Sequence, residues 1–191
     1  MGHAPMDGLR SLERQRTARF EAQILAHLDS AYRLARFLLR DAAVAKDAVQ
    51  DACLRAFNAF DQMQGPDARL WFLAVVRNVC MDHLRERRHR AHDEEYDDDQ
   101  HGGAVGSGLV PPATPEELAI LASDARWLRE AIEKLPKDYR EVIVLRELEE
   151  LSYKEISAIV DIPIGTVMSR LARARDLLQS RARGIYKEQR R

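Results

Sequence analysis

The chain has 191 residues, of which 46% are hydrophobic and 32% charged, a composition typical of one ordinary soluble domain or two small ones. The longest apolar run, LWFLAVV at 70–76, is too short to cross a bilayer, and the N-terminus lacks the apolar segment of a secretory signal, so we expect a cytoplasmic protein. The net charge of −1 conceals a segregation: residues 1–92 carry 15 Lys/Arg against 11 Asp/Glu (+4), residues 93–124 carry 9 acids and no Lys/Arg (−9), and residues 125–191 carry 15 against 11 (+4). A near-neutral total therefore does not exclude a polyanionic partner.

Helical periodicity dominates the first ninety residues. Apolar residues recur at three- and four-residue steps over 24–39 and over 45–60, and Asp41 stands where a cap of the second helix is expected. Asp67 can cap a third helix that continues over 68–90. Because no strand alternation of useful length interrupts this pattern, the first lobe is predicted to be a helical bundle.

The third of these helices carries residues that suit single-stranded nucleic acid. Trp71 stands near its start, Arg77 and Asn78 lie midway, and its end reads RERRHR, a run that includes Arg85 and Arg88. Unstacked bases can stack on an aromatic ring while nearby arginines neutralise the backbone. The alternative for Trp71 is an ordinary core residue, whereas the arginine run has no apolar role.

An acidic stretch separates the two helical parts of the chain. Residues 91–115 (AHDEEYDDDQHGGAVGSGLVPPATP) cannot bury enough apolar surface to order themselves, so they predict a flexible linker that leaves the two lobes free not to touch. The acids lack the spacing of metal ligands, and a solvated linker is favoured over a cation site. Cys53 is an isolated thiol, and Cys80 with His83 forms only a lone C-x-x-H, a weak zinc signal, so we expect no metal site and no disulfide scaffold. Since glycine-rich phosphate loops and nucleophile elbows are also missing, we predict a protein that has no cofactor and is not an enzyme.

The second lobe is predicted as a run of short helices that ends in a helix-turn-helix. SYKE at 152–155 is a Ser-x-x-Glu capping box that opens one helix, and DIPIGT at 161–166 turns the chain into the next. Residues 163–191 carry 8 basic against 2 acidic residues (+6), which favours a polyanion-binding helix over an ordinary solvated face.

On a helical wheel the last helix has an apolar and a polar side. The apolar side, which must face the preceding helices, gathers Ile164, Val167, Leu171, Ala174 and Leu178. Thr166, Ser169 and Arg173 lie opposite, with Arg170 on the flank. Hydroxyls and helix N-termini meet phosphates while arginine can fork onto guanine, so this side suits a major groove. Arg175 falls toward the apolar side, and we interpret it as a snorkelling or ion-paired structural residue.

Taken together, these blocks resemble the extracytoplasmic-function (ECF, group IV) sigma factors of bacterial RNA polymerase. DAVQDACLRAF (47–57) resembles the family's core-binding helix, LWFLAVVRNVCMDHLRERR (70–88) resembles its promoter-melting helix, and residues 135–178 are similar to its σ4 domain. The resemblance implies an all-α fold of two small helical domains. Its parts are an N-terminal extension (1–22), a σ2-like domain (23–90), the flexible acidic linker (91–115) and a σ4-like helix-turn-helix domain (116–187).

The resemblance also implies roles for individual residues. The positions where the family docks onto the β′ clamp helices are Asp47, Gln50, Asp51 and Leu54. Asn78 matches a position that helps hold a base flipped from the −10 element, and the loop 61–68 would form the pocket. The other residues assigned to −10 binding and melting are Trp71, Arg77, Arg85 and Arg88. The residues assigned to the −35 element are Arg146, Thr166, Ser169, Arg170 and Arg173.

The implied function is promoter-specific transcription initiation, with recognition of −35 and −10 DNA and help in strand opening. The implied partners are core RNA polymerase, through its β′ clamp helices and β flap, promoter DNA, and an anti-sigma factor that could hold the chain at the inner membrane; no small-molecule substrate is implied. Two other classes remain open. Residues 140–167 also resemble the DNA-binding end of response regulators, which would need a receiver or ligand domain with strands ahead of it. A metal-dependent nuclease using the acidic run would cleave DNA only with a cation.

Overall fold

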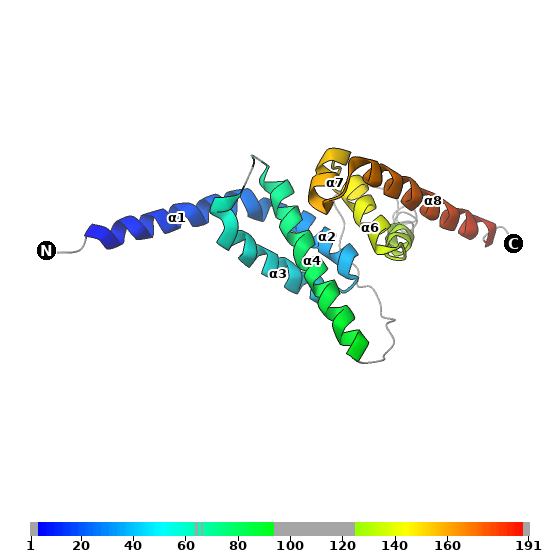
Figure 1. Cartoon of the computed structure of the whole chain (residues 1–191), viewed down its shortest axis with the longest axis horizontal. Coiled ribbons are helices and arrows are strands. Elements are labelled where there is room, and N and C mark those ends of the chain that lie inside the picture. The colour runs from blue at the N-terminus through cyan, green and yellow to red at the C-terminus, as the bar shows by residue number, and fades with distance from the viewer. Residues whose placement is uncertain (1–3, 64, 66, 94–124, 189–191) are drawn as a thin grey trace, which may run out of the picture.

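The computed structural model describes residues 4–63, 65, 67–93 and 125–188, and every regular element within these ranges is a helix. None of the described helices combines the length and the apolarity needed to cross a bilayer. Figure 1 shows α1 (Ala4–Ile24) and α8 (Ile164–Glu188) reaching toward opposite ends of the molecule, with the other helices between them. The all-α prediction is confirmed, and the described residues hold no strand from which a receiver domain could be built.

The first lobe consists of α1 and three further helices joined by short turns. These are α2 (Leu28–Leu39), α3 (Ala42–Ala59) and α4 (Ala68–Asp93), with 3-10 turns η1 (Leu25–His27) and η2 (Phe60–Gln62). Both predicted caps are confirmed. An Asp41 carboxylate oxygen accepts hydrogen bonds from the backbone N–H of Ala43 at 2.7 Å and of Val44 at 3.1 Å. Asp67 accepts one from the Leu70 N–H at 3.1 Å. These bonds satisfy amides that the first turn of a helix would otherwise leave unpaired.

The core of the first lobe is built where α2, α3 and α4 pack against one another. The fully buried residues of α3 are all alanines, Ala45, Ala48, Ala52 and Ala56, while larger, partly buried side chains such as Phe57 pack against the edge of the core. Larger buried side chains come from α2 and α4, among them Leu34, Leu38, Phe72 and Leu73. Small residues let helix backbones approach closely, so α3 lies near its neighbours and turns its polar side to solvent.

The predicted N-terminal extension continues directly into the first lobe, because α1 runs without a break from Ala4 to Ile24. Phe20 is buried and meets Phe57 and Phe60 edge-on, with ring centroids 5.1 and 5.4 Å apart. Arg16 donates from Nε to an Asp61 carboxylate oxygen at 2.7 Å and from Nη2 to the Phe57 carbonyl at 2.6 Å. These contacts fix the C-terminal half of α1 against the end of α3.

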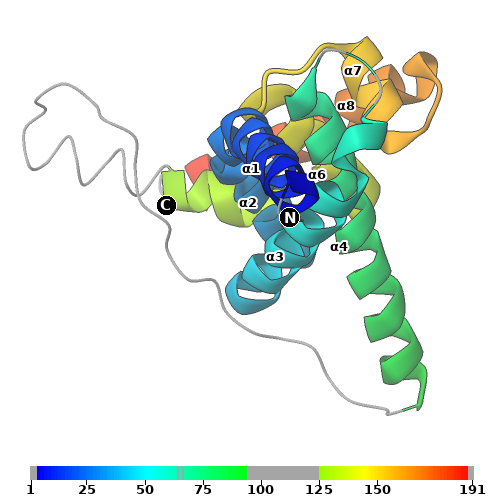
Figure 2. The ribbon, with the colours of Figure 1, turned by 90° about the vertical axis from the view of Figure 1, so that its left-hand side faces the viewer.

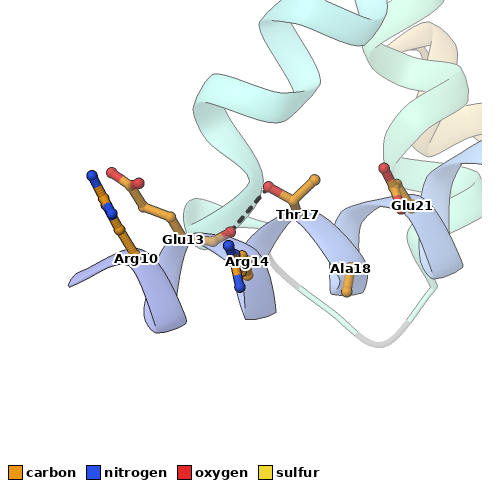
Figure 3. Close-up of a pocket in the computed structure, with 6 residues that line it drawn as sticks. All are labelled: Arg10, Glu13, Arg14, Thr17, Ala18 and Glu21. Atoms are coloured by element: carbon orange, nitrogen blue, oxygen red, sulfur yellow. Dashed lines mark hydrogen bonds between the residues drawn. The ribbon is translucent and has the colours of Figure 1, made fainter. Parts of the chain in front are cut away.

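The outer part of α1 has no such partners among the described residues. Figure 3 shows an open hollow there, whose lining comes from α1 alone: Arg10, Glu13, Arg14, Thr17, Ala18 and Glu21. The Thr17 hydroxyl donates to the Glu13 carbonyl one turn earlier at 3.0 Å. Because its lining among the described residues comes from a single helix, the hollow is an open helix surface and lacks the enclosure typical of small-molecule sites.

The second lobe contains helical residues 125–133, α6 (Lys137–Ile143), α7 (Tyr153–Val160) and α8. Between α6 and α7 the chain makes one π-helical turn, η3 (Val144–Leu148), which the Glu149 N–H closes on the Val144 carbonyl at 3.2 Å. The core of this lobe is formed by Leu135, Val142, Leu145, Ile156, Val167 and Leu171. α8 packs on both α6 and α7, which confirms the prediction that its apolar side faces the preceding helices.

The two lobes are in contact, although the sequence did not require it. Figures 1 and 2 show α7 beside α4 and α6 beside α2, and the buried apolar residues of both lobes form one contiguous cluster. α4 continues to Asp93, past the predicted boundary at 90. From residue 94 on, the predicted acidic linker lies outside the described residues.

Candidate nucleic-acid and protein interfaces

The helix-turn-helix is built from short-range contacts in the second lobe. The Ser152 hydroxyl oxygen accepts from the Glu155 N–H at 3.3 Å while a Glu155 carboxylate oxygen accepts from the Ser152 N–H at 2.6 Å, which confirms the predicted capping box. α7 ends at Asp161, whose φ of 57° is left-handed, and the Ser157 hydroxyl donates to the Ile162 carbonyl within the turn. The turn thus sets the angle at which α8 leaves α7.

The buried side of α8 matches the wheel with one exception. Val167, Leu171 and Ala174 are buried and Leu178 is half-buried. Ile164, placed on the buried side by its spacing, is 45% exposed, because it stands in the first turn of α8, ahead of Val167, where the burial begins. The predicted periodicity of buried residues along α8 is therefore confirmed, and the prediction that Ile164 is buried is wrong.

The outer side of α8 presents the predicted −35 residues together. Ser169 and Arg173 are exposed, while Thr166 and Arg170 are half-buried. An Arg170 Nη2 lies 3.0 Å from an Asp138 carboxylate oxygen, and Arg173 Nη1 lies 3.5 Å from the Tyr139 hydroxyl. The hydrogen bond to Tyr139 raises the pKa of Arg173. Two residues at the start of α6 therefore orient both arginines, and Arg173 stays exposed.

Arg146 lies apart from this row, in the π-helical turn. Its Nη1 donates to the Leu151 carbonyl at 2.8 Å, and its guanidinium sits 5.2 Å from the Tyr153 ring centroid. Arg175 is ion-paired with Glu147 at 2.7 Å, which confirms its interpretation as a paired structural residue and raises its pKa. Arg146 is thus held in place by contacts within its own lobe.

The predicted −10 residues all lie on α4 but in different surroundings. Asn78 and Arg88 are exposed. Trp71 is half-buried and packs against the core, so it serves packing while part of its side chain stays accessible. Arg85 pairs with Asp82 at 2.7 Å, and Arg77 donates from Nε to a Glu141 carboxylate oxygen at 2.7 Å.

Asp82 also pairs with Arg55 of α3 at 2.7 Å, and this hydrogen bond is the main cause that lowers the pKa of Asp82. The carboxylate therefore links α3 to α4 beside the arginine-rich end of α4. This contact holds the two helices together where the predicted −10 arginines begin.

Sequence reasoning missed the partner of Arg77, because Glu141 belongs to the second lobe. Glu141 is 1% exposed even though it is charged. The available signal was its spacing: it stands four residues before Leu145 and so falls on the apolar side of its helix. A carboxylate on the buried side of a helix needs a positively charged partner, but the spacing of residues in the sequence does not identify that partner.

The predicted polymerase-binding residues share one exposed side of α3. Asp47, Gln50, Asp51 and Leu54 follow steps of three, one and three residues, and all four are exposed, Leu54 by 59%. They lie on the opposite side of the helix from the buried alanines. An exposed leucine ringed by polar side chains is the kind of anchor that protein interfaces use.

No cluster of three or more potential metal ligands occurs among the described residues. Burial raises the pKa of the Cys80 thiol to about 12, so at neutral pH it is a protonated core group and not a thiolate ligand. His83 lies 3.7 Å from an Asp51 carboxylate oxygen instead of meeting a second cysteine. The acidic run from 94 onward, on which the nuclease alternative depends, lies outside the described residues.

Comparisons with known proteins agree with this geometry. Residues 24–90 match the family model of sigma-70 region 2, and residues 125–178 match that of sigma-70 region 4. The chain is 33% identical over 143 residues to the ECF RNA polymerase sigma-E factor of Escherichia coli strain K12, an alignment that covers 74% of this chain and 75% of the relative. Against the sigma-E factor of Haemophilus influenzae the identity is 32% over 137 residues, with coverage of 71% and 72%.

Solved structures show the same fold. The sigma factor RpoE from Bartonella quintana, crystallised with the anti-sigma factor NepR, superposes with a TM-score of 0.67 at 28% identity, covering 85% of this chain and 95% of that one. CnrH in complex with the cytosolic domain of CnrY superposes with a TM-score of 0.60 at 24% identity, covering 92% and 97%.

Proposed function

The chain belongs to the extracytoplasmic-function sigma factors, and from this premise we propose how its two lobes direct core RNA polymerase to a promoter. α8 of the second lobe reads the −35 element, α4 of the first lobe captures the −10 element, and α3 docks onto the polymerase. The observation that carries this assignment is the two-sided structure of α8. Its apolar side is buried through Val167, Leu171 and Ala174, which leaves the hydroxyl- and arginine-bearing side facing outward.

At the −35 element, the first turns of α8 enter the major groove. Thr166 and Ser169 reach phosphates, while Arg170 and Arg173 reach phosphates or guanine edges. Asp138 and Tyr139 limit the rotamers of these two arginines, so less conformational freedom is lost when DNA binds. Arg146 adds a contact from the π-helical turn through the part of its guanidinium that Leu151 and Tyr153 leave free.

At the −10 element, α4 supplies the surface for the separated strand. Asn78 holds an extruded base, the accessible part of Trp71 offers a stacking surface, and Arg77, Arg85 and Arg88 neutralise the backbone. Unpairing a base costs a few kcal/mol, and a pocket that binds the extruded base, together with stacking, offsets roughly this free energy. The chain supplies positioning and strand capture and leaves bond formation to the polymerase, so we infer that it is not itself an enzyme and needs no cofactor or small-molecule substrate.

The polymerase contacts follow from the exposed side of α3. Asp47, Gln50, Asp51 and Leu54 dock onto the β′ clamp helices, and the second lobe rests on the β flap. Because both lobes are bound to the same polymerase, once one lobe has bound the promoter the other lobe binds it intramolecularly, at a high effective concentration. Two weak DNA contacts then give a high overall affinity for the promoter. Each lobe by itself makes few phosphate contacts and binds DNA weakly.

An anti-sigma factor restrains the chain in this proposal. The support is the likeness to RpoE of Bartonella quintana, whose structure was solved with the anti-sigma factor NepR. Because the polymerase works in the cytoplasm, we place the chain there, and a membrane-bound anti-sigma factor would hold it at the inner membrane.

The test is promoter-specific transcription with purified core polymerase, followed by sequencing of the transcript starts. Arg173→Ala should lower −35-dependent initiation by roughly fivefold to a hundredfold while polymerase binding stays unchanged. Arg175→Ala is the matched control, since it lies two residues away on the same helix but is paired with Glu147. Equal losses in both variants, or loss of polymerase binding in Arg173→Ala, would contradict the assignment of α8.

A further inference from the structure

α8 carries exposed apolar side chains that the assignment of its polar side leaves unexplained. Ile164 is 45% exposed, and Met168, one turn later, is 52% exposed. Ala172, a further turn along, is exposed as well. Residues four positions apart in a helix lie about 40° apart around its axis, so these side chains follow one line along the first turns of α8. Ile164, Met168 and Ala172 form the apolar stripe.

The apolar stripe borders the polar side of α8 that is proposed to meet the −35 element. Met168 directly precedes Ser169, and Ala172 directly precedes Arg173, and both of these polar residues are exposed. Consecutive residues lie about 100° apart, so the stripe forms one edge of the exposed side and Arg170 stands at the other edge. A major groove about 12 Å wide admits a helix that measures about 10–12 Å across with its side chains. When Ser169 meets DNA, Met168 beside it is therefore also enclosed by the groove.

The apolar stripe is unsuited to a phosphate, because it has neither a hydrogen-bond donor nor a positive charge. The arginine on the same side of α8, seven residues after Met168, is Arg175, whose guanidinium is held by a Glu147 carboxylate oxygen at 2.7 Å. The Glu147 side chain is itself partly exposed, and its negative charge repels phosphates. This flank of α8 therefore favours a neutral, apolar partner.

One group on the base edges meets this requirement. In the major groove all four bases present hydrogen-bonding groups, and thymine alone adds a methyl group, on C5. Methionine has three rotatable bonds and a polarisable sulfur, so its side chain adapts to the position of such a methyl group. One turn of helix advances about 5.4 Å and bases on one strand are about 3.4 Å apart, so Ile164 reaches a base one or two steps from the one that Met168 meets.

We propose that Met168, with Ile164 beside it, makes α8 selective for thymine in the −35 element by burying the C5-methyl group of that base. This inference rests on the proposed function, because it takes α8 as the helix that enters the −35 groove. The hydroxyls and arginines of the polar side then supply orientation and the contacts to phosphates and guanine. The apolar stripe supplies the preference for thymine over cytosine, which has no methyl group at this position.

The experiment uses the full chain with core polymerase and the promoter identified by sequencing the transcript starts. Each thymine of its −35 element, on either strand, is replaced singly by deoxyuridine, which removes the methyl group and keeps the base pair. Fluorescence anisotropy of the labelled duplex gives the affinity of the holoenzyme. For at least one thymine the replacement should weaken binding roughly threefold to fivefold, the effect expected from burial of one methyl group.

Three variants connect this effect to the apolar stripe. Met168→Ala should bind the thymine promoter more weakly by a similar factor and should no longer distinguish thymine from uracil at that position. Met168→Leu retains an apolar side chain of similar volume and should retain the distinction. Leu177→Ala is the matched control, because Leu177 is another exposed apolar residue of α8 but stands nine residues further from its N-terminus; it should behave as the parent does. Since both positions are exposed, neither change removes a core contact.

The possible failures are distinguishable. Promoter-specific initiation with an affinity that no uracil replacement changes would refute the inference and leave the proposed function standing. A uracil effect that persists in Met168→Ala would place the methyl group against a different residue and also refute it. Normal promoter binding by Met168→Ala on every template would mean that the stripe serves a protein partner and not DNA. If the parent directs no promoter-specific initiation, the proposed function fails and this inference fails with it.

Discussion

Replacing Phe20 with alanine should detach α1 from the rest of the first lobe. The ring is only 7% exposed and meets Phe57 and Phe60 edge-on. Truncating a buried phenylalanine to alanine costs about 3–5 kcal/mol, of which two ring pairs supply about 1–3 kcal/mol. Because whole domains are stable by about 5–15 kcal/mol, this is a large share of the unfolding free energy.

Urea unfolding followed by circular dichroism measures this loss. With a slope of about 1–3 kcal/mol per molar urea, the midpoint should fall by about 2 M. Leu12→Ala is the control on the same helix: Leu12 is 64% exposed, so its loss should change the unfolding free energy by no more than about 0.5 kcal/mol. If Phe20→Ala costs less than about 1 kcal/mol, α1 is not docked in solution and the reasoning fails.

Four further outcomes are expected. Ser152→Ala should cost about 1 kcal/mol in thermal unfolding at neutral pH. The hydrogen bonds with Ser152 lower the pKa of Glu155 in the folded state. The carboxylate of Glu155 therefore contributes to the free energy of unfolding at pH values above the usual carboxyl range, and this contribution is lost as the pH falls through the folded-state pKa. A stability loss in Glu155→Gln that persisted in strong acid would contradict this sign. A thiol reagent at neutral pH should label Cys53, which is partly exposed, well before Cys80, whose pKa is about 12, and equal labelling rates would show that the α4 core opens readily. Ala52→Leu should destabilise the first lobe by about 1–3 kcal/mol through overpacking, and a neutral result in urea unfolding would mean that α3 has room to move.

The features that the sequence predicted are those that depend on near neighbours. The Asp41 and Asp67 caps, the Ser152–Glu155 box and the buried side of α8 each involve residues within a few turns of one another. For the same reason the four positions of α3 that were predicted to bind polymerase fall on one exposed side. Periodicity and capping act over these distances, so they can be read locally.

The contact between the lobes could not be predicted in this way. Arg77 and Glu141 are 64 positions apart in the sequence, and Arg33 and Glu149 are 116 apart. In the sequence each is one charge among many, and Arg77 was assigned to DNA because its neighbours favour that function. Ile164 was misplaced for a related reason: a wheel treats all turns of a helix alike, whereas its first turn has neighbours on fewer sides.

The alanines of α3 have a mechanical consequence. The fully buried residues of α3 are all alanines, so the helix backbones of α3 and α4 lie close together, and the Arg55–Asp82 pair joins them a second time. A displacement of α3 is therefore expected to carry α4 with it. If α3 docks onto the polymerase as proposed, its position also sets that of α4, the helix proposed to capture the separated strand. In the proposed function, the close packing of these two helices thus couples the polymerase contact on α3 to the DNA contact on α4.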